Sequence, residues 1–360
     1  MSILYANLAL VFSFSLFARY ISLPAPPSLA DPVPVKPNKL FAFGAMVILV
    51  LISGLRRNIG DTYYYRHAYE TTTFTWEIVW EGKDMGFGLL QMLLQEISRD
   101  PQILIFTTAL ITNVLILIIL YKYSRMFELA LYVYITGGLF LVSMNGIRQF
   151  LAAAIIFAAT KFIIDGSWKK FTLVVLLAST FHQSALILIP IYFLIRRKAW
   201  TKTTAWLLAL AVVIVIGYEQ FSDLLFSSIS NTQYGGYSEF SEGGASILRI
   251  AVTAAPLILA YLGRDKLREI FPSSDYFVNL GLLNLVFMII SLQNWIFARF
   301  TIYFGLYQLI IMAWIVKLFH EKDQKFIYYA ILVLYFIYFY YEHVISLNID
   351  YRSDFDFLNF

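Results

Sequence analysis

Long apolar runs separated by short clusters of Lys and Arg most limit how this chain can fold. The runs lie at residues 3–20, 40–55, 103–121, 126–142, 147–164, 203–217, 247–262, 276–291, 295–316 and 326–343. Each is close to the roughly 20 apolar residues with which a helix crosses a bilayer. Only 14% of the residues are charged, whereas a soluble domain carries about 25%. The pattern predicts an all-α integral membrane protein, a polytopic helical bundle of about 10–12 transmembrane helices, in a single domain over residues 1–360.

The basic residues are unevenly distributed between the two ends of these runs. If residues 21–39 face the cytoplasm and the helices alternate, 18 of the 27 Lys and Arg residues fall on the cytoplasmic side. Such an excess is the positive-inside rule, and it sets the orientation. The formal net charge of +4 follows from these loops, so we expect no nucleic-acid partner. Residues 3–20 lack the features of a signal peptide and are expected to remain as the first helix.

Residues 171–195 conflict with simple alternation. At about 1.5 Å per residue, this apolar stretch is long enough for one crossing. One crossing would move every later basic cluster to the other side, against the charge bias. We therefore predict a re-entrant segment, in which two short half-helices meet near His182 and fold back. Irregular backbone at membrane depth is tolerated only inside protein or beside a water-filled cavity, so His182 is expected at a cavity.

Two long polar segments fall on the extracytoplasmic side. Residues 56–101 are predicted to form a loop with an interfacial or re-entrant helix over 87–97, with Asp84 as a candidate N-cap. Residues 218–246 are rich in Ser, Gly, Tyr and acidic residues and are predicted to form a mobile lid. Both segments would cover the outer ends of the helices.

The composition argues against several kinds of site. Because the sequence has no Cys, disulfides, thiolate metal sites and a cysteine nucleophile are excluded. The four His residues are scattered without the spacing of metal ligands. The sequence has no P-loop, Rossmann fingerprint or G-x-S-x-G motif. We expect neither a metal nor a cofactor.

An Arg pair follows the second apolar run at its extracytoplasmic end. Arg56 and Arg57 stand beside a turn that Gly60 permits, and the planar guanidinium group suits a phosphate. Asp61 could order this turn or accept a proton from a sugar hydroxyl. Arginines that merely extend toward the lipid head groups would give the same pattern, so both interpretations stay open.

Three more arginines fall at a similar depth on separate helices. Arg148 lies in the first turn of a predicted helix, beside Asn145 and Gln149. A positive charge there opposes the helix dipole and is a poor choice for stability alone. Arg249 and Arg299 lie at the same ends of two other apolar runs. Converging arginines favour a ligand with two or more negative charges. A lipid-linked pyrophosphate fits, because its polyprenyl tail could stay in the bilayer.

His182 is the candidate general base. Neutral imidazole has an unperturbed pKa of about 6.5 and can take a proton from a hydroxyl. A lone His more commonly packs between helices with a hydrogen bond to a backbone carbonyl, and that alternative stays open. Asp61 is the competing candidate base. Tyr64 lies in a run of three tyrosines that could stack on sugar rings.

Five segments together share the sequence patterns of a known family. They are residues 55–64 (LRRNIGDTYY), 84–87 (DMGF), 145–152 (NGIRQFLA), 181–186 (FHQSAL) and 298–303 (ARFTIY). In this order they resemble the EpsG family of Wzy-type polysaccharide polymerases, and the resemblance covers most of the chain. Residues 348–360 lack the Pro-Tyr ending of that family.

The resemblance implies a GT-C-like fold and a metal-independent glycosyltransferase of the bacterial plasma (inner) membrane. Such an enzyme transfers a growing glycan from undecaprenyl pyrophosphate to the next lipid-linked repeat unit on the extracytoplasmic face. It needs no nucleotide-sugar cofactor. The expected partners are undecaprenyl-pyrophosphate-linked oligosaccharides, membrane lipid, a flippase and a chain-length regulator.

Roles for the candidate residues follow from the residues and the resemblance together. The expected ligands of the donor pyrophosphate are Arg56, Arg57, Arg148, Arg249 and Arg299. The expected catalytic residues are His182 and Asp61. The residues expected to support the site or bind sugar are Asn145, Gln149, Tyr64, Asp84 and Tyr303.

Three other classes of membrane protein are alternatives to a polymerase. A glycan ligase would share the donor site and differ only in the acceptor. A lipid-linked oligosaccharide flippase would need polar residues along a central path, whereas the charges here cluster at one end of the helices. A membrane acyltransferase would need a His with an Asp, or an Arg with a His, facing the acyl donor, and no pattern marks such a site.

Overall fold

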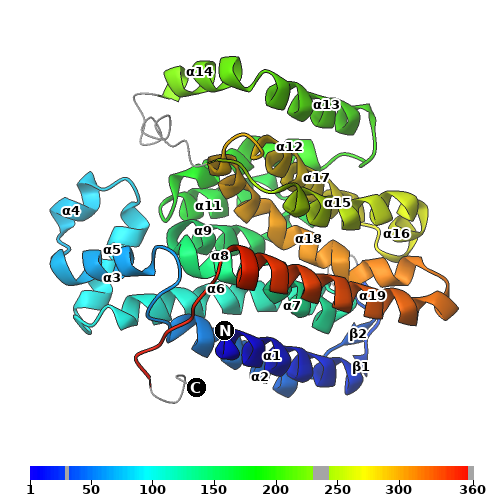
Figure 1. The fold of residues 1–360 in the computed structure, drawn as a ribbon, viewed down its shortest axis with the longest axis horizontal. Coiled ribbons are helices and arrows are strands. Elements are labelled where there is room, and N and C mark those ends of the chain that lie inside the picture. Colours follow the sequence, from blue (N-terminus) through cyan, green and yellow to red (C-terminus); the bar gives the residue numbers. More distant parts are fainter. Residues whose placement is uncertain (29–31, 230–242, 356–360) are drawn as a thin grey trace.

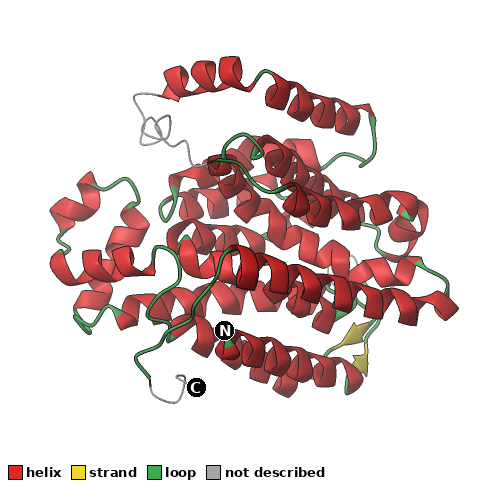
Figure 2. Cartoon of the chain, viewed as in Figure 1, coloured by secondary structure: helices red, strands yellow, loops and turns green. Residues whose placement is uncertain are grey.

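The computed structural model describes residues 1–28, 32–229 and 243–355, and this part is almost entirely helical (Figure 2). Its only strands, β1 (Leu23–Pro24) and β2 (Val35–Lys36), form a short antiparallel hairpin. The prediction of an all-α protein is confirmed.

The helices divide into two groups along the chain. The first contains α1 (Ser2–Tyr20), α2 (Lys39–Gly54), α3 (Thr62–Thr71), α4 (Trp76–Glu81), α5 (Met85–Gln95), α6 (Gln102–Tyr123), α7 (Phe127–Thr136), α8 (Leu139–Asn145), α9 (Ile147–Ala158) and α10 (Thr160–Ile164). The second contains α11 (Trp168–Ser179), η1 (Gln183–Ile187), α12 (Leu188–Ile195), α13 (Lys202–Ile216), α14 (Tyr218–Ile229), α15 (Ile247–Leu262), α16 (Arg264–Ile270), α17 (Ser274–Ile290), η3 (Trp295–Phe300), α18 (Thr301–Ile315), η4 (Val316–Leu318), α19 (Glu321–Phe339) and η5 (Tyr340–Ser346).

The helices are those of a multi-pass membrane protein. In the described residues, four are long and apolar enough to cross a membrane, or up to seven if each of three bent pairs is one span. Shorter apolar helices of 10–17 residues accompany them. The candidate spans in the described residues are thus fewer than the predicted 10–12, because some apolar runs break and others form helices of only 10–17 residues. The predicted polytopic helical bundle is confirmed.

Segments predicted for the two sides of the membrane lie at opposite ends of the molecule. Figure 1 shows α3, α4 and α5 together at one end, and β1, β2 and α16 at the other. At the second end, Lys266 Nζ donates to the carbonyl oxygens of Leu318 and Phe319, each at 3.3 Å. Pro34 and Arg125 line the same hollow as Lys266. Loops assigned to one side by their charge therefore meet in space.

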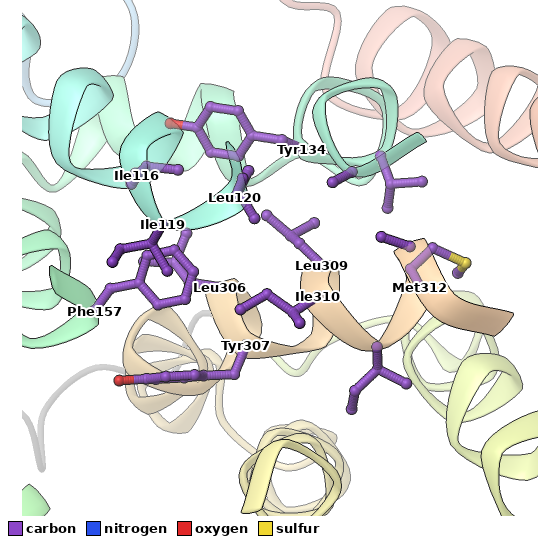
Figure 3. Close-up of a cluster of buried hydrophobic side chains, with 14 of the residues drawn as sticks. Ile116, Ile119, Leu120, Tyr134, Phe157, Leu306, Tyr307, Leu309, Ile310 and Met312 are labelled. Atoms are coloured by element: carbon purple, nitrogen blue, oxygen red, sulfur yellow. The ribbon is translucent and has the colours of Figure 1, made fainter. Parts of the chain in front are cut away.

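Helix α18 is the centre of the bundle. All of its residues are buried, and Figure 3 shows its side chains against those of α6, α7 and α9. The rings of Phe157 and Tyr307 meet edge to face with centroids 5.0 Å apart. A tightly packed core of this kind holds the polar ends of the surrounding helices in fixed positions.

Residues 171–195 fold back, as predicted. Helix α11 ends at Ser179, and the chain restarts at Gln183 as the 3-10 helix η1, which leads into α12. Trp168, at the start of α11, meets Phe193 near the end of α12, with ring centroids 6.2 Å apart. Phe171 and Tyr192 lie 5.1 Å apart. The two half-helices are therefore antiparallel neighbours.

Two other predicted helices are also broken. The run at 126–142 becomes α7 and α8, which are bent by 55°, with Gly138 at φ +89° between them. The run at 326–343 ends in a π-helical turn, η5. Residues of both breaks line the same cavity.

The predicted lid is described only in part. Its first residues form α14, which is bent by 95° from α13 at Gly217. Tyr218 and Phe221 of α14 both pack on Phe297 of η3. Residues 230–242 of the predicted lid lie outside the described residues.

Candidate active site

One cavity collects most of the polar residues that the sequence singled out. Its volume is about 600 Å³, within the range of about 300–1,000 Å³ typical of ligand sites. The predicted site residues that line it are Asp61, Asn145, Arg148, Gln149, His182, Arg249 and Arg299. They come from separate segments of the chain, so the fold brings the motifs together.

A strained turn builds one wall of the cavity. Ile59 and Gly60 have φ angles of +88° and +51°, and a positive φ is rare for a β-branched residue such as Ile. Asn145 Oδ1 accepts a hydrogen bond from the Asp61 backbone N–H at 2.9 Å. A Cβ on Gly60 would overlap that Oδ1 atom. The turn thus joins the segment after α2 to the end of α8, and such strain clusters at functional sites.

Arg148 is held by an acidic residue from the 56–101 segment. It lies in the first turn of α9, and its Nη1 atom pairs with Asp84 Oδ2 at 2.7 Å. Asp84 occupies the N-cap position of α5 but makes no capping hydrogen bond there. Its Oδ1 accepts from the backbone N–H of Gln183 at 3.3 Å. Burial raises the pKa of Asp84, while Arg148 acts in the opposite direction.

Aromatic rings surround the Arg148 guanidinium. Its central carbon lies 5.9 Å from the ring centroid of Tyr65 and 6.0 Å from that of Phe87. Cation–π contacts of this kind fix a guanidinium without using all of its N–H donors. Burial raises the pKa of Tyr65, which also lines the cavity. The sequence did not single out Tyr65 from its neighbours in the tyrosine run.

His182 lies at the tip of the re-entrant hairpin. Its Nδ1 atom is 2.7 Å from Ser184 Oγ, which is 2.8 Å from the hydroxyl of Tyr303. If Nδ1 carries the proton, Nε2 is an acceptor, and it makes no hydrogen bond to the described residues. Arg148 and Arg299 are both close enough to act electrostatically on the ring. The histidine therefore shares one cavity with two guanidiniums that act on its ring.

Arg299 reaches the cavity from the 3-10 helix η3. Its guanidinium carbon lies 4.9 Å from the ring centroid of Trp295. Its carbonyl oxygen accepts a hydrogen bond from Gln149 Nε2 at 2.9 Å. Gln149 thus ties the first turn of α9 to η3.

Arg56 lies outside this cavity. It is 1% exposed and does not line the cavity. Its Nε atom donates to Thr62 Oγ1 at 3.0 Å, its Nη2 to the Met144 carbonyl at 2.8 Å, and its Nη1 to the Ser53 carbonyl. Its described hydrogen bonds join α2, α3 and α8.

The remaining predicted residues also lie outside the cavity lining. Arg57 is largely exposed and pairs with Asp354 at 3.0 Å. Its backbone N–H donates to the carbonyl of Arg352 at 2.8 Å. The C-terminal residues around Arg352 and Asp354 therefore lie against Arg57. Tyr64 is 70% exposed, and Tyr303 is buried against Ser184. In the structure Tyr303 orients the hydrogen-bond chain to His182.

Several cavity residues were missed by the sequence reasoning, among them an adjacent acid and histidine. Glu342 and His343 end the run at 326–343, and both line the cavity. Glu342 accepts a hydrogen bond from Arg249 Nε at 2.7 Å. In the sequence, the only sign of a site here is an acidic residue next to a histidine at the end of an apolar run. No group of three or more His, Cys, Asp or Glu in the described chain could hold a metal ion.

The fold and the cavity define a multi-pass helical membrane protein with a polar site that contains arginines, carboxylates and a histidine. Residues 39–353 match the model of the EpsG family, and the chain belongs to that family. EpsG is a family of Wzy-like polymerases, which places the protein in polysaccharide biosynthesis and confirms the resemblance seen in the sequence. No curated protein and no solved structure matches the chain.

Proposed function

We propose that this protein is the polymerase that transfers a growing glycan from undecaprenyl pyrophosphate to the next lipid-linked repeat unit. The observation that carries the proposal is that His182 lines one polar cavity together with Arg148 and Arg299. A base in the same cavity as two cationic groups suits a reaction in which a hydroxyl loses a proton while a pyrophosphate leaves.

The arginines supply the charge that the leaving group needs. Arg148 and Arg299 would hold the donor pyrophosphate and stabilise the negative charge that grows on it as the bond breaks. Their planar donor groups suit phosphate oxygens. This arrangement supports a metal-independent reaction, because fixed cations stand where a divalent ion would otherwise act.

The proposed step is a substitution at the anomeric carbon of the donor sugar. The bond from this carbon to the pyrophosphate oxygen breaks, and the pyrophosphate leaves with the electron pair. The acceptor hydroxyl forms the new glycosidic bond. Its proton passes to His182 Nε2, with Asp61 as the competing base. Ser184 and Tyr303 orient the ring through Nδ1.

The proposed site faces the extracytoplasmic side of the bacterial plasma membrane. The cavity is built in part by the 56–101 segment, which the charge bias assigns to that side. A flippase would supply the repeat units there, and a chain-length regulator would act on the product.

Reconstitution with purified lipid-linked repeat units tests this function. The wild-type protein should make a ladder of long chains on a gel, with or without a metal chelator. His182→Ala should lower the rate by about 10²–10⁴-fold, whereas His320→Ala, an exposed histidine remote from the cavity, should not. An inactive Asp61→Asn variant beside an active His182→Ala variant would transfer the role of base to Asp61. Wild-type protein that makes no chains would refute the polymerase.

A further inference from the structure

Helix α19 ends in a π-helical turn that directs two ionisable residues inward. Glu342 and His343 are 2% and 4% exposed, whereas Tyr340, Tyr341 and Ile345 of the same turn are exposed. π-Helical turns are rare and are frequent at functional sites. Ionisable residues within an apolar helix are costly and usually have a function.

Two polar side chains at this end of the cavity have atoms without a hydrogen-bond partner in the described part of the chain. Neither ring nitrogen of His343 has a hydrogen-bond partner among the described residues, and neither has Asn284 Oδ1. Both residues line the cavity. A buried polar atom without a partner costs about 1–3 kcal/mol, so a native structure that keeps several of them calls for a ligand or a bound water.

Glu342 and Arg249 balance each other's charge beside these atoms. Arg249 donates to Glu342 through Nε and Nη2, and both bonds end on Oε1. Glu342 Oε2 accepts no hydrogen bond from the described residues. This end of the cavity thus offers atoms that can only accept, at Glu342 and Asn284, beside a histidine.

The chemistry of these atoms selects the ligand. An ionised phosphate has only acceptors, so it could not satisfy Glu342 Oε2 or Asn284 Oδ1 and would be repelled by the carboxylate. A sugar hydroxyl both donates and accepts, and it satisfies all three groups. We propose that Glu342, His343 and Asn284 form a subsite for the neutral acceptor sugar, with Arg249 as the residue that positions Glu342.

This subsite rests on the proposed function and divides the cavity between the two substrates. The pyrophosphate of the donor binds near Arg148 and Arg299, and the acceptor sugar binds at the π-helical turn. Gly138 provides the space, because a Cβ there would lie 2.9 Å from His343 Cε1 and 3.0 Å from Nε2. The bend between α7 and α8 therefore serves to admit this histidine.

Two binding probes separate the subsites in purified protein. One is the free repeat-unit oligosaccharide, released from its carrier by mild acid, and the other is undecaprenyl pyrophosphate. His343→Phe and Asn284→Leu should each weaken oligosaccharide binding by about tenfold or more, the worth of one lost hydrogen bond. Both should keep the affinity for undecaprenyl pyrophosphate. Arg148→Ala should show the reverse, and His343→Gln should retain part of the oligosaccharide binding.

The outcomes distinguish the subsite from the polymerase itself. Wild-type oligosaccharide affinity in both His343→Phe and Asn284→Leu would overturn the subsite, even if the protein makes polymer. An equal loss for both probes would also overturn it, because a general structural defect would then explain the loss. If the selective loss is seen but the wild-type protein makes no chains, the sugar subsite stands and the polymerase fails. Asn284→Leu, on a separate helix, decides the matter if His343→Phe does not fold.

Discussion

At the scale of single residues, identical side chains have different functions because their surroundings differ. Arg56 directly follows one apolar run and Arg148 lies at the start of another, at a similar predicted depth. Arg56 is enclosed by backbone carbonyls, while Arg148 reaches the cavity with an acidic partner. Burial and partners come from segments distant in sequence, so the sequence could not separate a structural arginine from a ligand-binding one.

Arg56→Ala is expected to destabilise the fold. The change removes the buried donor of the Ser53 carbonyl and leaves the Met144 carbonyl only the longer bond from Thr62 Oγ1 at 3.4 Å. A buried polar group that loses its partner costs about 1–3 kcal/mol. Thermal unfolding in detergent would measure the effect. Arg57→Ala is the matched control, because its exposed pair with Asp354 is worth at most about 1 kcal/mol. Unchanged unfolding of Arg56→Ala, with loss of undecaprenyl pyrophosphate binding, would instead restore Arg56 to the donor site.

At the scale of elements, the site is made where helices break. His182 and Asn294 share an extended backbone, with φ angles of −156° and −152°. Each is followed by a 3-10 helix. Helix η1 contains Ser184, which contacts His182, and helix η3 contains Arg299. The first break was predictable, because the charge bias required residues 171–195 to fold back. The second falls in the gap between the predicted runs 276–291 and 295–316, but the 3-10 geometry of η3 that follows it was not predicted.

Helix α5 packs closely against the re-entrant hairpin, and a substitution at this contact can test the packing. The Gly86 N–H donates to the Thr180 carbonyl at 2.8 Å. A Cβ on Gly86 would overlap Thr180 Oγ1 and lie 3.1 Å from its carbonyl carbon. Gly86→Ala should therefore push α5 away, cost about 1–3 kcal/mol, and loosen the hold of Asp84 on Arg148.

A neighbouring glycine provides the control for this change. A Cβ on Gly88 would meet Val79 Cγ2 at an ordinary 3.4 Å, so Gly88→Ala should be neutral or slightly stabilising in a helix. The two variants are compared by thermal unfolding and by chain synthesis. Equal behaviour of the two would show that α5 and the hairpin are not tightly coupled.

At the scale of the whole molecule, the sequence predicted the class of fold and much of the cavity wall. Hydropathy predicted the helical bundle. The motifs predicted six of the residues that line the cavity, and the position of Arg249 at the start of an apolar run added a seventh. It missed Glu342 and His343, because a π-helical turn leaves no periodic signature in an apolar run. It also could not foresee that the tail would dock on Arg57. These features depend on which segments meet, and hydrophobic periodicity does not encode that.

The orientation of the whole molecule can be tested by labelling. The chain has no Cys, so single cysteines report without background. Glu77 and Lys322 are both exposed, and they lie in segments that the charge bias places on opposite sides. We expect a membrane-impermeant maleimide to label Glu77→Cys in intact cells, and Lys322→Cys only after the membrane is opened. The reverse pattern would place the cavity on the cytoplasmic face, where undecaprenyl-linked units would not need a flippase. Labelling of both sites in intact cells would contradict the alternation of the helices itself.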